Sequence, residues 1–343
     1  MKDEGRLCYI LGVAIVFELD DAGLDKFAKI KVIGVGGGGG NILRSVRENY
    51  DLDMTLVGLN SDLRQLHALE KQGITVLPIG EKLTQGRGTG GRVEVGEEAA
   101  RSEEKAIRQM LEGTDLVIIT ATMGGGLGTG AAPVVAEIAH DMGILSIGVV
   151  TTPFHFEMPR KMQTAQAGIA RMQGMTDAFI TMRNDNLLKI APDRKMSFVD
   201  AFALADEVLR QTVGCVAELI LTTGVINVDF ADVTTIFRQS ASSETLLAIG
   251  TDETPQKAVR KAMESPLLDR STAGARGVVL NLTGGPAMSL RDVDEAVRYI
   301  HGHAHPAVNI IAGLVVQEDM AGKVQATLVA TDFDESYVPP EEG

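Results

Sequence analysis

The sequence has no tryptophan, only two cysteines and few aromatic side chains, which make up 4% of its 343 residues. Cys8 and Cys215 are too few for a disulfide framework or a four-cysteine metal site, and we expect a cytoplasmic protein. Basic residues are also scarce, since 32 Lys and Arg stand against 46 Asp and Glu, a net charge of −14. Such a surface repels phosphate, so neither nucleic acid nor an anionic membrane is an expected partner.

Long apolar runs are missing as well. Residues 7–17, LCYILGVAIVF, form the longest run near the N-terminus, and a membrane span needs about 20 residues. The charge-mixed MKDEGR before it and the absence of a small-residue cleavage site argue against a secretory signal. We expect residues 1–28 to be an N-terminal extension with a buried or self-associating element, a membrane-touching segment being the alternative. No direct membrane insertion is expected.

Glycine, in contrast, is abundant: 38 of the 343 residues are glycine, which is about 11% of the chain against a usual share of about 7%. The apolar fraction of 45% excludes a disordered chain, and the length suggests two domains. Short Val/Ile-rich runs alternate with helical stretches, which is typical of a parallel sheet covered on both faces. The expected strands are residues 29–35, 54–60, 74–80, 115–122, 144–152 and 178–182.

A long helix is predicted over residues 197–220, where apolar residues recur at steps of three and four. Ser197 and Asp200 have the spacing of a capping box, and the helix would be about 36 Å long. After a loop at 222–233, an α+β pattern follows, with strands at 277–284, 307–316 and 324–331 and helices at 254–264 and 290–300. The expected organisation is a Rossmann-like α/β domain at 29–196, a central helix at 197–222, a smaller α+β domain at 223–331 and a disordered tail at 332–343.

Three glycine-rich segments follow predicted strands. The first, GVGGGGGN, ends at Asn41, where we expect a helix to begin. Glycines there let backbone N–H groups approach a phosphate, and the helix N-terminus favours an anion. A dinucleotide site would look similar, but the acidic residue expected about 20 positions later is matched only imperfectly, by Asn60-Ser61-Asp62.

The second segment, MGGGLGTG at 123–130, and the third, GRGTGGRVEVG at 86–96, favour a longer phosphate chain. Together they could surround a nucleoside triphosphate with backbone amides, with Mg²⁺ sharing its charge. The lysine-dependent P-loop mechanism is excluded because no G-x-x-x-x-G-K-[ST] stretch exists.

Several motifs then resemble one known family. GGGLGTG is similar to the tubulin signature GGGTGTG. GVGGGGGN, VTTPFHFE (150–157), RNDNLL (183–188), AFALADEVL (201–209) and NVDFADV (227–233) look like FtsZ, the bacterial tubulin-like cell-division GTPases. The resemblance runs from about residue 29 to 331. It implies GTP binding, head-to-tail polymerisation and hydrolysis at the subunit junction, with cell-division accessory proteins as further partners and the division site as a location.

The resemblance also implies roles for individual residues. Glu157 would take the ribose, with Arg160 or Lys161 near the sugar-phosphate, and Asn184, Phe202 and Asp206 would recognise guanine. A carboxylate can accept the adjacent N1–H and N2–H donors of guanine, which adenine lacks, and an aromatic ring can stack on the base. The phosphates would be held by Gly37, Gly38, Gly39, Gly40, Asn41, Gly90, Gly124, Gly125, Gly126, Leu127, Gly128, Thr129 and Gly130.

Asn227, Asp229 and Asp232 are the catalytic candidates that the resemblance supplies. They follow the long helix, about 24 Å beyond Asp206, so they cannot reach the nucleotide that Asp206 reads in the same subunit. In the family they meet the neighbour's γ-phosphate, where Asp229 and Asp232 would polarise the attacking water.

The sequence also departs from the family's pattern. Leu127 replaces a threonine, Arg92-Val93 replaces the usual Asn-Pro, and Lys161 replaces an arginine that Arg160 could compensate. The family's C-terminal adaptor-binding peptide is absent from this sequence. A divergent paralogue that binds GTP with weak or no hydrolysis is therefore the alternative, and a dinucleotide oxidoreductase is a weaker one.

A histidine cluster offers one further candidate site. His301, His303 and His305, in HGHAH, could suggest a metal, but no acidic or cysteine partner is near in sequence. We interpret them as an exposed loop and expect no protein metal site.

Overall fold

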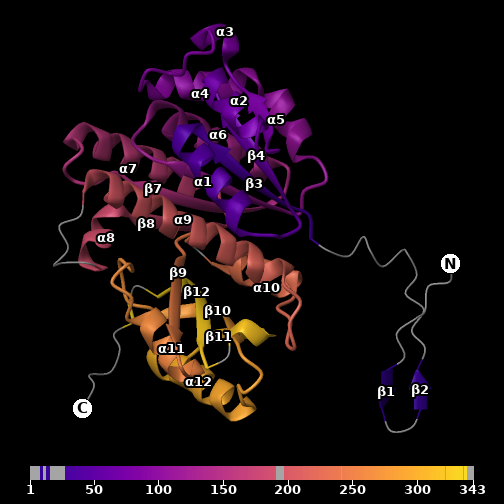
Figure 1. The fold of residues 1–343 in the computed structure, drawn as a ribbon. Coiled ribbons are helices and arrows are strands. Elements are labelled where there is room, and N and C mark those ends of the chain that lie inside the picture. The colour runs from indigo at the N-terminus through magenta and orange to yellow at the C-terminus, as the bar shows by residue number, and fades with distance from the viewer. Residues whose placement is uncertain are drawn as a thin grey trace.

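The computed structural model describes residues 8–10, 13–15, 28–190, 197–240, 242–320, 322–334 and 336–337. Two sheets lie on either side of one long helix (Figure 1). Near the N-terminus, β1 (Cys8–Ile10) and β2 (Val13–Ile15) pair antiparallel. The burial or self-association expected of residues 7–17, and most of the tail expected to be disordered, lie outside the described residues.

The larger sheet confirms the expected parallel architecture. Its order is β5-β4-β3-β6-β7-β8, and every neighbouring pair is parallel. Apolar side chains on the inner strands are almost fully buried because helices cover both faces. The strands are β3 (Ile30–Val35), β4 (Met54–Asn60), β5 (Thr75–Pro78), β6 (Leu116–Thr122), β7 (Leu145–Thr152) and β8 (Ala178–Arg183).

Helices divide between the two faces of this sheet. The core on one face is completed by α4 (Val93–Ser102), α5 (Glu104–Leu111), α6 (Gly126–Asp141) and α7 (Pro159–Gln173). The core on the other is completed by α1 (Gly36–Asn49), α2 (Leu63–Glu70) and α9 (Phe198–Leu221). The short helices α3 (Glu81–Thr84) and α8 (Asn184–Ile190) lie in connections. Between α2 and β5, an exposed turn at 71–73 returns the chain at the amino edge of the sheet, with Gly73 at φ +74°.

Most of the first two glycine segments form helix rather than the loops we expected, whereas residues 86–92 of the third form a loop. α1 begins at Gly36, not near Asn41, and α6 begins at Gly126. The cause is close packing: a Cβ on Gly38 would lie 2.2 Å from Thr122 Oγ1, and one on Gly39 would lie 2.8 Å from the carbonyl oxygen of Thr120. Tertiary packing therefore overrides the poor helix propensity of glycine.

The long helix α9 spans 24 residues, and Ser197 and Asp200 form the expected capping box. Its buried residues share one core with the parallel sheet and with Val279 and Val329 of the second sheet, so α9 joins the two domains. The loop expected at 222–233 ends early, because α10 (Phe230–Gln239) already begins after Asp229, whose side chain caps it.

The smaller sheet has the order β11-β10-β12-β9, with β10 and β11 parallel and the other pairs antiparallel. Strand β9 was not predicted, and β12 continues two residues beyond the expected end at 331. The helix α12 includes His301 and His303, so these residues do not form the loop that we expected. The elements are β9 (Leu246–Asp252), α11 (Pro255–Met263), β10 (Ala275–Gly284), α12 (Leu290–His303), β11 (Asn309–Val316), the 3-10 helix η2 (Glu318–Met320) and β12 (Val324–Phe333).

Candidate nucleotide site

Three adjoining hollows follow the carboxyl edge of the parallel sheet. Strand order reverses between β3 and β6, the place where open α/β sheets bind ligands. We name the hollows after the helix that borders each: the α9 hollow (about 370 Å³), the α6 hollow (about 200 Å³) and the α2 hollow (about 400 Å³). Thr122 and Gly125 line both the α9 and α6 hollows, and Gly37, Asn60 and Asp62 line both the α6 and α2 hollows.

The α6 hollow has the features of an anion site. Gly125 is the N-cap of α6, and the residues 126–128 that follow it line the hollow. The N–H groups of a first helical turn have no partner within the helix, and the helix dipole favours negative charge beside them. Leu127, which stands where the family has threonine, is only 7% exposed and packs into the core of that face.

Not every predicted phosphate glycine lies in these hollows. A Cβ on Gly130 would lie 2.2 Å from the carbonyl oxygen of Val93, so this residue allows α4 to pack on α6. Gly39 packs against β3 in the same way. Thr129 Oγ1 accepts a hydrogen bond of 2.9 Å from the Gly124 amide and so holds the segment before α6. Gly90 is exposed, at φ +61°, in the loop before α4.

The α9 hollow brings together the three residues expected to recognise a base. Phe202 and Asp206 line it from α9, and Asn184 lines it from the start of α8. Asn184 is 6% exposed, and its Oδ1 has no hydrogen-bond partner among the described residues. Burial raises the pKa of the Asp206 carboxyl. Within the described part of the chain, the hollow therefore presents oxygen acceptors without protein donors.

An aromatic cluster borders the same hollow. Phe202 meets Phe154 edge to face, with 5.5 Å between ring centroids, and Phe154 stacks on Phe156 at 4.9 Å. Phe202 remains 43% exposed, so one part of its ring stays open to a ligand. Aromatic side chains in this position can stack on a planar base.

Glu157 and Lys161 also line the α9 hollow, and they contact each other. Lys161 Nζ donates to Glu157 Oε2 at 3.0 Å, while Glu157 Oε1 accepts from the Phe154 amide at 3.0 Å. Lys161 is thus held beside the carboxylate expected to bind ribose. Arg160, the other basic candidate, is exposed.

Sequence reasoning missed several polar residues at this edge. Asn60 Nδ2 donates to Gln65 Oε1 at 2.7 Å, and Asn60 Oδ1 accepts from the Asp62 amide at 3.0 Å. Asp62 caps α2, and a hydrogen bond from Arg64 lowers the pKa of its carboxyl. The sequence signal for these residues is the Asn-Ser-Asp at the end of β4, which matches the acidic position of a dinucleotide site only imperfectly.

The three catalytic candidates lie elsewhere. Asn227 Oδ1 accepts from the Gly224 amide at 2.6 Å, Asp229 caps α10, and Asp232 lies in the first turn of that helix. All three residues are exposed. They lie past the C-terminal end of α9, whereas the hollow residues Phe202 and Asp206 lie in its first turns (Figure 1). One chain therefore does not bring the two sets together.

The histidine cluster forms no metal centre within the described part of the chain, where no group of three or more His, Cys, Asp or Glu side chains could hold an ion. His303 Nδ1 lies 2.7 Å from the carbonyl oxygen of Tyr299, and His305 Nε2 lies 3.6 Å from Asp334 Oδ2. These two rings serve local contacts.

Comparisons with known proteins identify the family. The GTPase domain of the tubulin/FtsZ family matches residues 29–192, and the C-terminal domain of the FtsZ family matches residues 244–334. A solved structure of an empty FtsZ dimer from M. jannaschii is 36% identical, with a TM-score of 0.82, over 90% of this chain and 89% of that one. The chain is a member of the FtsZ family. It is therefore a GTPase that binds GTP and GDP, from a family of polymerising cytoskeletal proteins.

More distant structures share the fold of this FtsZ-family chain. A GTPγS-bound protofilament of CetZ2 from Haloferax volcanii is 20% identical, with a TM-score of 0.75, over 90% of this chain and 94% of that one. GDP-bound monomeric CetZ1 from the same organism is 19% identical, with a TM-score of 0.76, over 90% and 95%. Among the described residues, no helix combines the length and apolarity needed to cross a bilayer.

Proposed function

We propose that this GTPase assembles head to tail and that the loop after α9 of one subunit completes the nucleotide site of the next. The observation that carries the proposal is the separation of the two parts by α9. Its 24 residues span about 36 Å, with the hollows at one end and Asn227, Asp229 and Asp232 beyond the other. A second copy is the simplest way to bring them together. The FtsZ dimer and the CetZ2 protofilament among related structures support this self-association.

The nucleotide would lie along the three hollows. The base would occupy the α9 hollow, where Asp206 and Asn184 offer oxygen acceptors and Phe202 offers a ring face. Glu157 would accept a ribose hydroxyl beside Lys161, with Arg160 near the sugar-phosphate. The first turns of α1 and α6 would hold the phosphates, which suits the glycine-lined α6 hollow and its helix N-terminus.

Mg²⁺ fits the oxygen groups at the phosphate end. Magnesium is typically held by one or two carboxylates together with substrate phosphates and water. Asp62 and Gln65 line the α6 hollow and carry one carboxylate and one amide oxygen. Arg64 pairs with the carboxylate and Asn60 donates to the amide oxygen, so an ion would share or replace these contacts. We assign these two side chains to the ion, which would offset phosphate charge. The absence of a larger acidic cluster among the described residues suits an ion held mainly by the nucleotide.

Within the junction, Asp229 and Asp232 would polarise the attacking water, and Asn227 would order the loop that carries them. Asn227 already accepts from the Gly224 amide at 2.6 Å, and Asp229 Oδ1 accepts from the Ala231 amide at 3.1 Å. The loop is thus organised before a neighbour arrives. Cytoplasmic filaments acting in cell division are the cellular role that fits the family.

A divergent paralogue with slow hydrolysis is the second candidate. Leu127 is buried where a hydroxyl could contact phosphate, and the ammonium of Lys161 lies against Glu157. Both features would lower turnover more than binding, because the other lining residues remain.

Phosphate release from GTP, measured across protein concentrations with ATP as control, tests the proposal. Turnover per subunit should be near zero below a threshold concentration and rise above it. Asp229→Ala should abolish it, while Asp294→Ala, an exposed aspartate paired with Arg298 on α12, should not. Constant turnover per subunit would contradict a shared site. GTP binding without release at any concentration would favour the paralogue.

Mixing two inactive variants gives a sharper result. Asp206→Ala should lose nucleotide recognition, and Asp229→Ala should lose catalysis. Junctions that pair the nucleotide end of an Asp229→Ala subunit with the loop end of an Asp206→Ala subunit contain both intact parts. The mixture should therefore regain turnover that neither variant shows alone, and continued inactivity of co-assembled filaments would count against catalysis in trans.

A further inference from the structure

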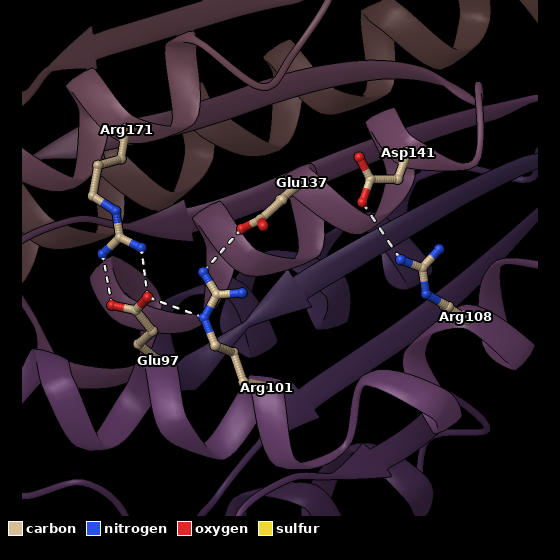
Figure 2. Close-up of polar contacts among 6 residues, drawn as sticks. All are labelled: Glu97, Arg101, Arg108, Glu137, Asp141 and Arg171. Atoms are coloured by element: carbon tan, nitrogen blue, oxygen red, sulfur yellow. Dashed lines mark hydrogen bonds and ion pairs between the residues drawn. The ribbon is translucent and has the colours of Figure 1, made fainter.

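Four charged side chains form a network across α4, α6 and α7 (Figure 2). Arg171 donates through Nη1 and Nη2 to the two carboxylate oxygens of Glu97, at 2.9 and 2.8 Å. Arg101 donates to Glu97 Oε1 at 3.2 Å and, through Nη2, to Glu137 Oε2 at 3.0 Å. Glu97 on α4 thus lies between two guanidinium groups: Arg171 joins it to α7, and Arg101, on α4 itself, continues the network to α6. We refer to these four residues as the Glu97 network.

The helices under the network touch at backbone distance. A Cβ on Gly96 of α4 would lie 2.4 Å from the carbonyl oxygen of Gly126, and one on Gly168 of α7 would lie 2.4 Å from Thr129 Cγ2. Together with Gly130, these glycines leave little room for α4 or α7 to move toward α6. Movement away from α6 is the remaining freedom, and the ion pairs of the network oppose it.

Each of the three helices leads away from a part of the nucleotide site. α6 begins at the α6 hollow, and α7 begins between Glu157 and Lys161. α4 begins directly after the loop 86–92, in which Gly88 and Thr89 line the α6 hollow. A Cβ on Gly126 would lie 2.3 Å from Thr89 Oγ1 and 2.7 Å from the Arg92 amide nitrogen. The loop therefore rests on the first turn of α6.

We propose that Glu97 is a positioning residue for the terminal phosphate: its ion pair with Arg171 joins α4 to α7, and its contact to Arg101 orients the guanidinium that joins α4 to Glu137 of α6. Together these contacts hold α4, and with it the loop 86–92, against the start of α6. The inference rests on the proposed placement of the triphosphate in the α6 hollow. With the base in the α9 hollow and the phosphates in the α6 hollow, the terminal phosphate would lie nearest Gly88 and Thr89. The network would therefore contribute to the preference for GTP over GDP and not to recognition of guanine. The hydrogen bond from Arg171 lowers the pKa of the Glu97 carboxyl, which therefore stays ionised in the neutral range.

Glu97→Gln tests the proposal because it removes the charge and keeps the shape. Glu104→Gln is the matched control, because Glu104 pairs with Arg108 at 2.9 Å on α5. Arg108 also reaches Asp141 at the far end of α6 (Figure 2). The measurement is the affinity of each full-length protein for GTPγS and for GDP, by competition with a fluorescent guanine nucleotide below the assembly threshold.

We expect Glu97→Gln to weaken GTPγS binding roughly fivefold, the scale of a partly exposed charge network, with GDP affinity changed less than twofold. Arg171→Gln should have the same effect, and the double variant should be no worse than either single one. Glu104→Gln should leave both affinities unchanged. The KM for GTP should rise more than kcat falls.

Other outcomes overturn the inference. Equal loss of GTPγS and GDP affinity would show a merely structural role, and unchanged affinities in both Glu97→Gln and Arg171→Gln would show no role. If either variant fails to fold, Glu97→Asp keeps the charge and should show a smaller shift of the GTPγS-to-GDP ratio in the same direction; no shift would overturn the proposal. Failure of Asp206→Ala to weaken either nucleotide in the same assay would instead overturn the proposed nucleotide placement.

Discussion

Replacement of Gly130 by alanine measures how tightly α4 packs on α6. A Cβ at this position would lie 2.2 Å from the Val93 carbonyl oxygen and 2.7 Å from the Glu97 amide nitrogen. Both neighbours are backbone, so no side chain can rotate away. The helices would have to separate by about 0.8 Å to reach even a 3.0 Å contact, and overpacking of this kind costs about 1–3 kcal/mol.

The helix propensity of alanine offsets part of this cost, by about 1 kcal/mol at most. We therefore expect Gly130→Ala to lower the free energy of unfolding by up to about 2 kcal/mol, measured by urea denaturation followed by circular dichroism. GTPγS affinity should fall as well, because the loop 86–92 moves with α4.

Gly302→Ala is the control, for which we expect the free energy of unfolding to change in the opposite direction. Gly302 lies in α12, and a Cβ there would meet nothing within 4 Å. Its replacement should stabilise the protein by a few tenths to about 1 kcal/mol. If Gly130→Ala proved as stable as Gly302→Ala, the close packing of α4 on α6 would be refuted.

Three further expectations concern single side chains. Burial raises the pKa of Asp206 above its value in the unfolded chain, so ionisation of this carboxyl lowers the stability of the folded protein as the pH rises through the folded-state pKa. Asp206→Asn should therefore raise the Tm of the nucleotide-free protein at pH 7, and this gain should shrink as the pH falls. The same substitution should weaken GTP binding. Burial raises the pKa of Cys215 to about 12. In a Cys8→Ser variant, the thiol of Cys215 should therefore react with a disulfide reagent at pH 8 only after the protein unfolds. Rapid reaction of the folded protein would contradict this. Leu127→Thr should cost about 1–3 kcal/mol of stability, since the leucine is buried, and a variant as stable as the parent would contradict this packing. The same variant should release more phosphate per subunit. Unchanged release would show that the missing hydroxyl does not limit turnover.

The sheets were largely predictable because burial on both faces leaves continuous apolar runs in the sequence. The missed strand β9 has only a short apolar run, LLAIG, whose residues alternate between buried and half-buried. Gly250 within it also weakens any strand pattern. Its place is set by pairing with β12, which is a tertiary contact.

The residues of the site were predictable where binding chemistry requires a particular residue type. They were less predictable where close packing between helices requires it. Asp206, Phe202 and Asn184 line one hollow, and their role in recognising guanine stays a prediction. The glycine runs, by contrast, combine two causes that look alike in sequence: Gly125 and Gly37 line hollows, while Gly39 and Gly130 make room for neighbouring backbone. Only the distances between helices separate them. The placement of Asn60, Asp62 and Gln65 likewise depends on which strand ends adjoin.

The turn at 71–73 has a practical consequence for following this protein in a living cell. Every proposed nucleotide group lies at the carboxyl edge of the parallel sheet, and the loop with Asp229 lies beyond α9. The turn lies at the opposite edge, and a Cβ on Gly73 would meet nothing within 4 Å. A fluorescent reporter inserted after Gly73 would thus lie away from every group assigned to the nucleotide, and we expect the tagged protein to keep its affinity for GTP.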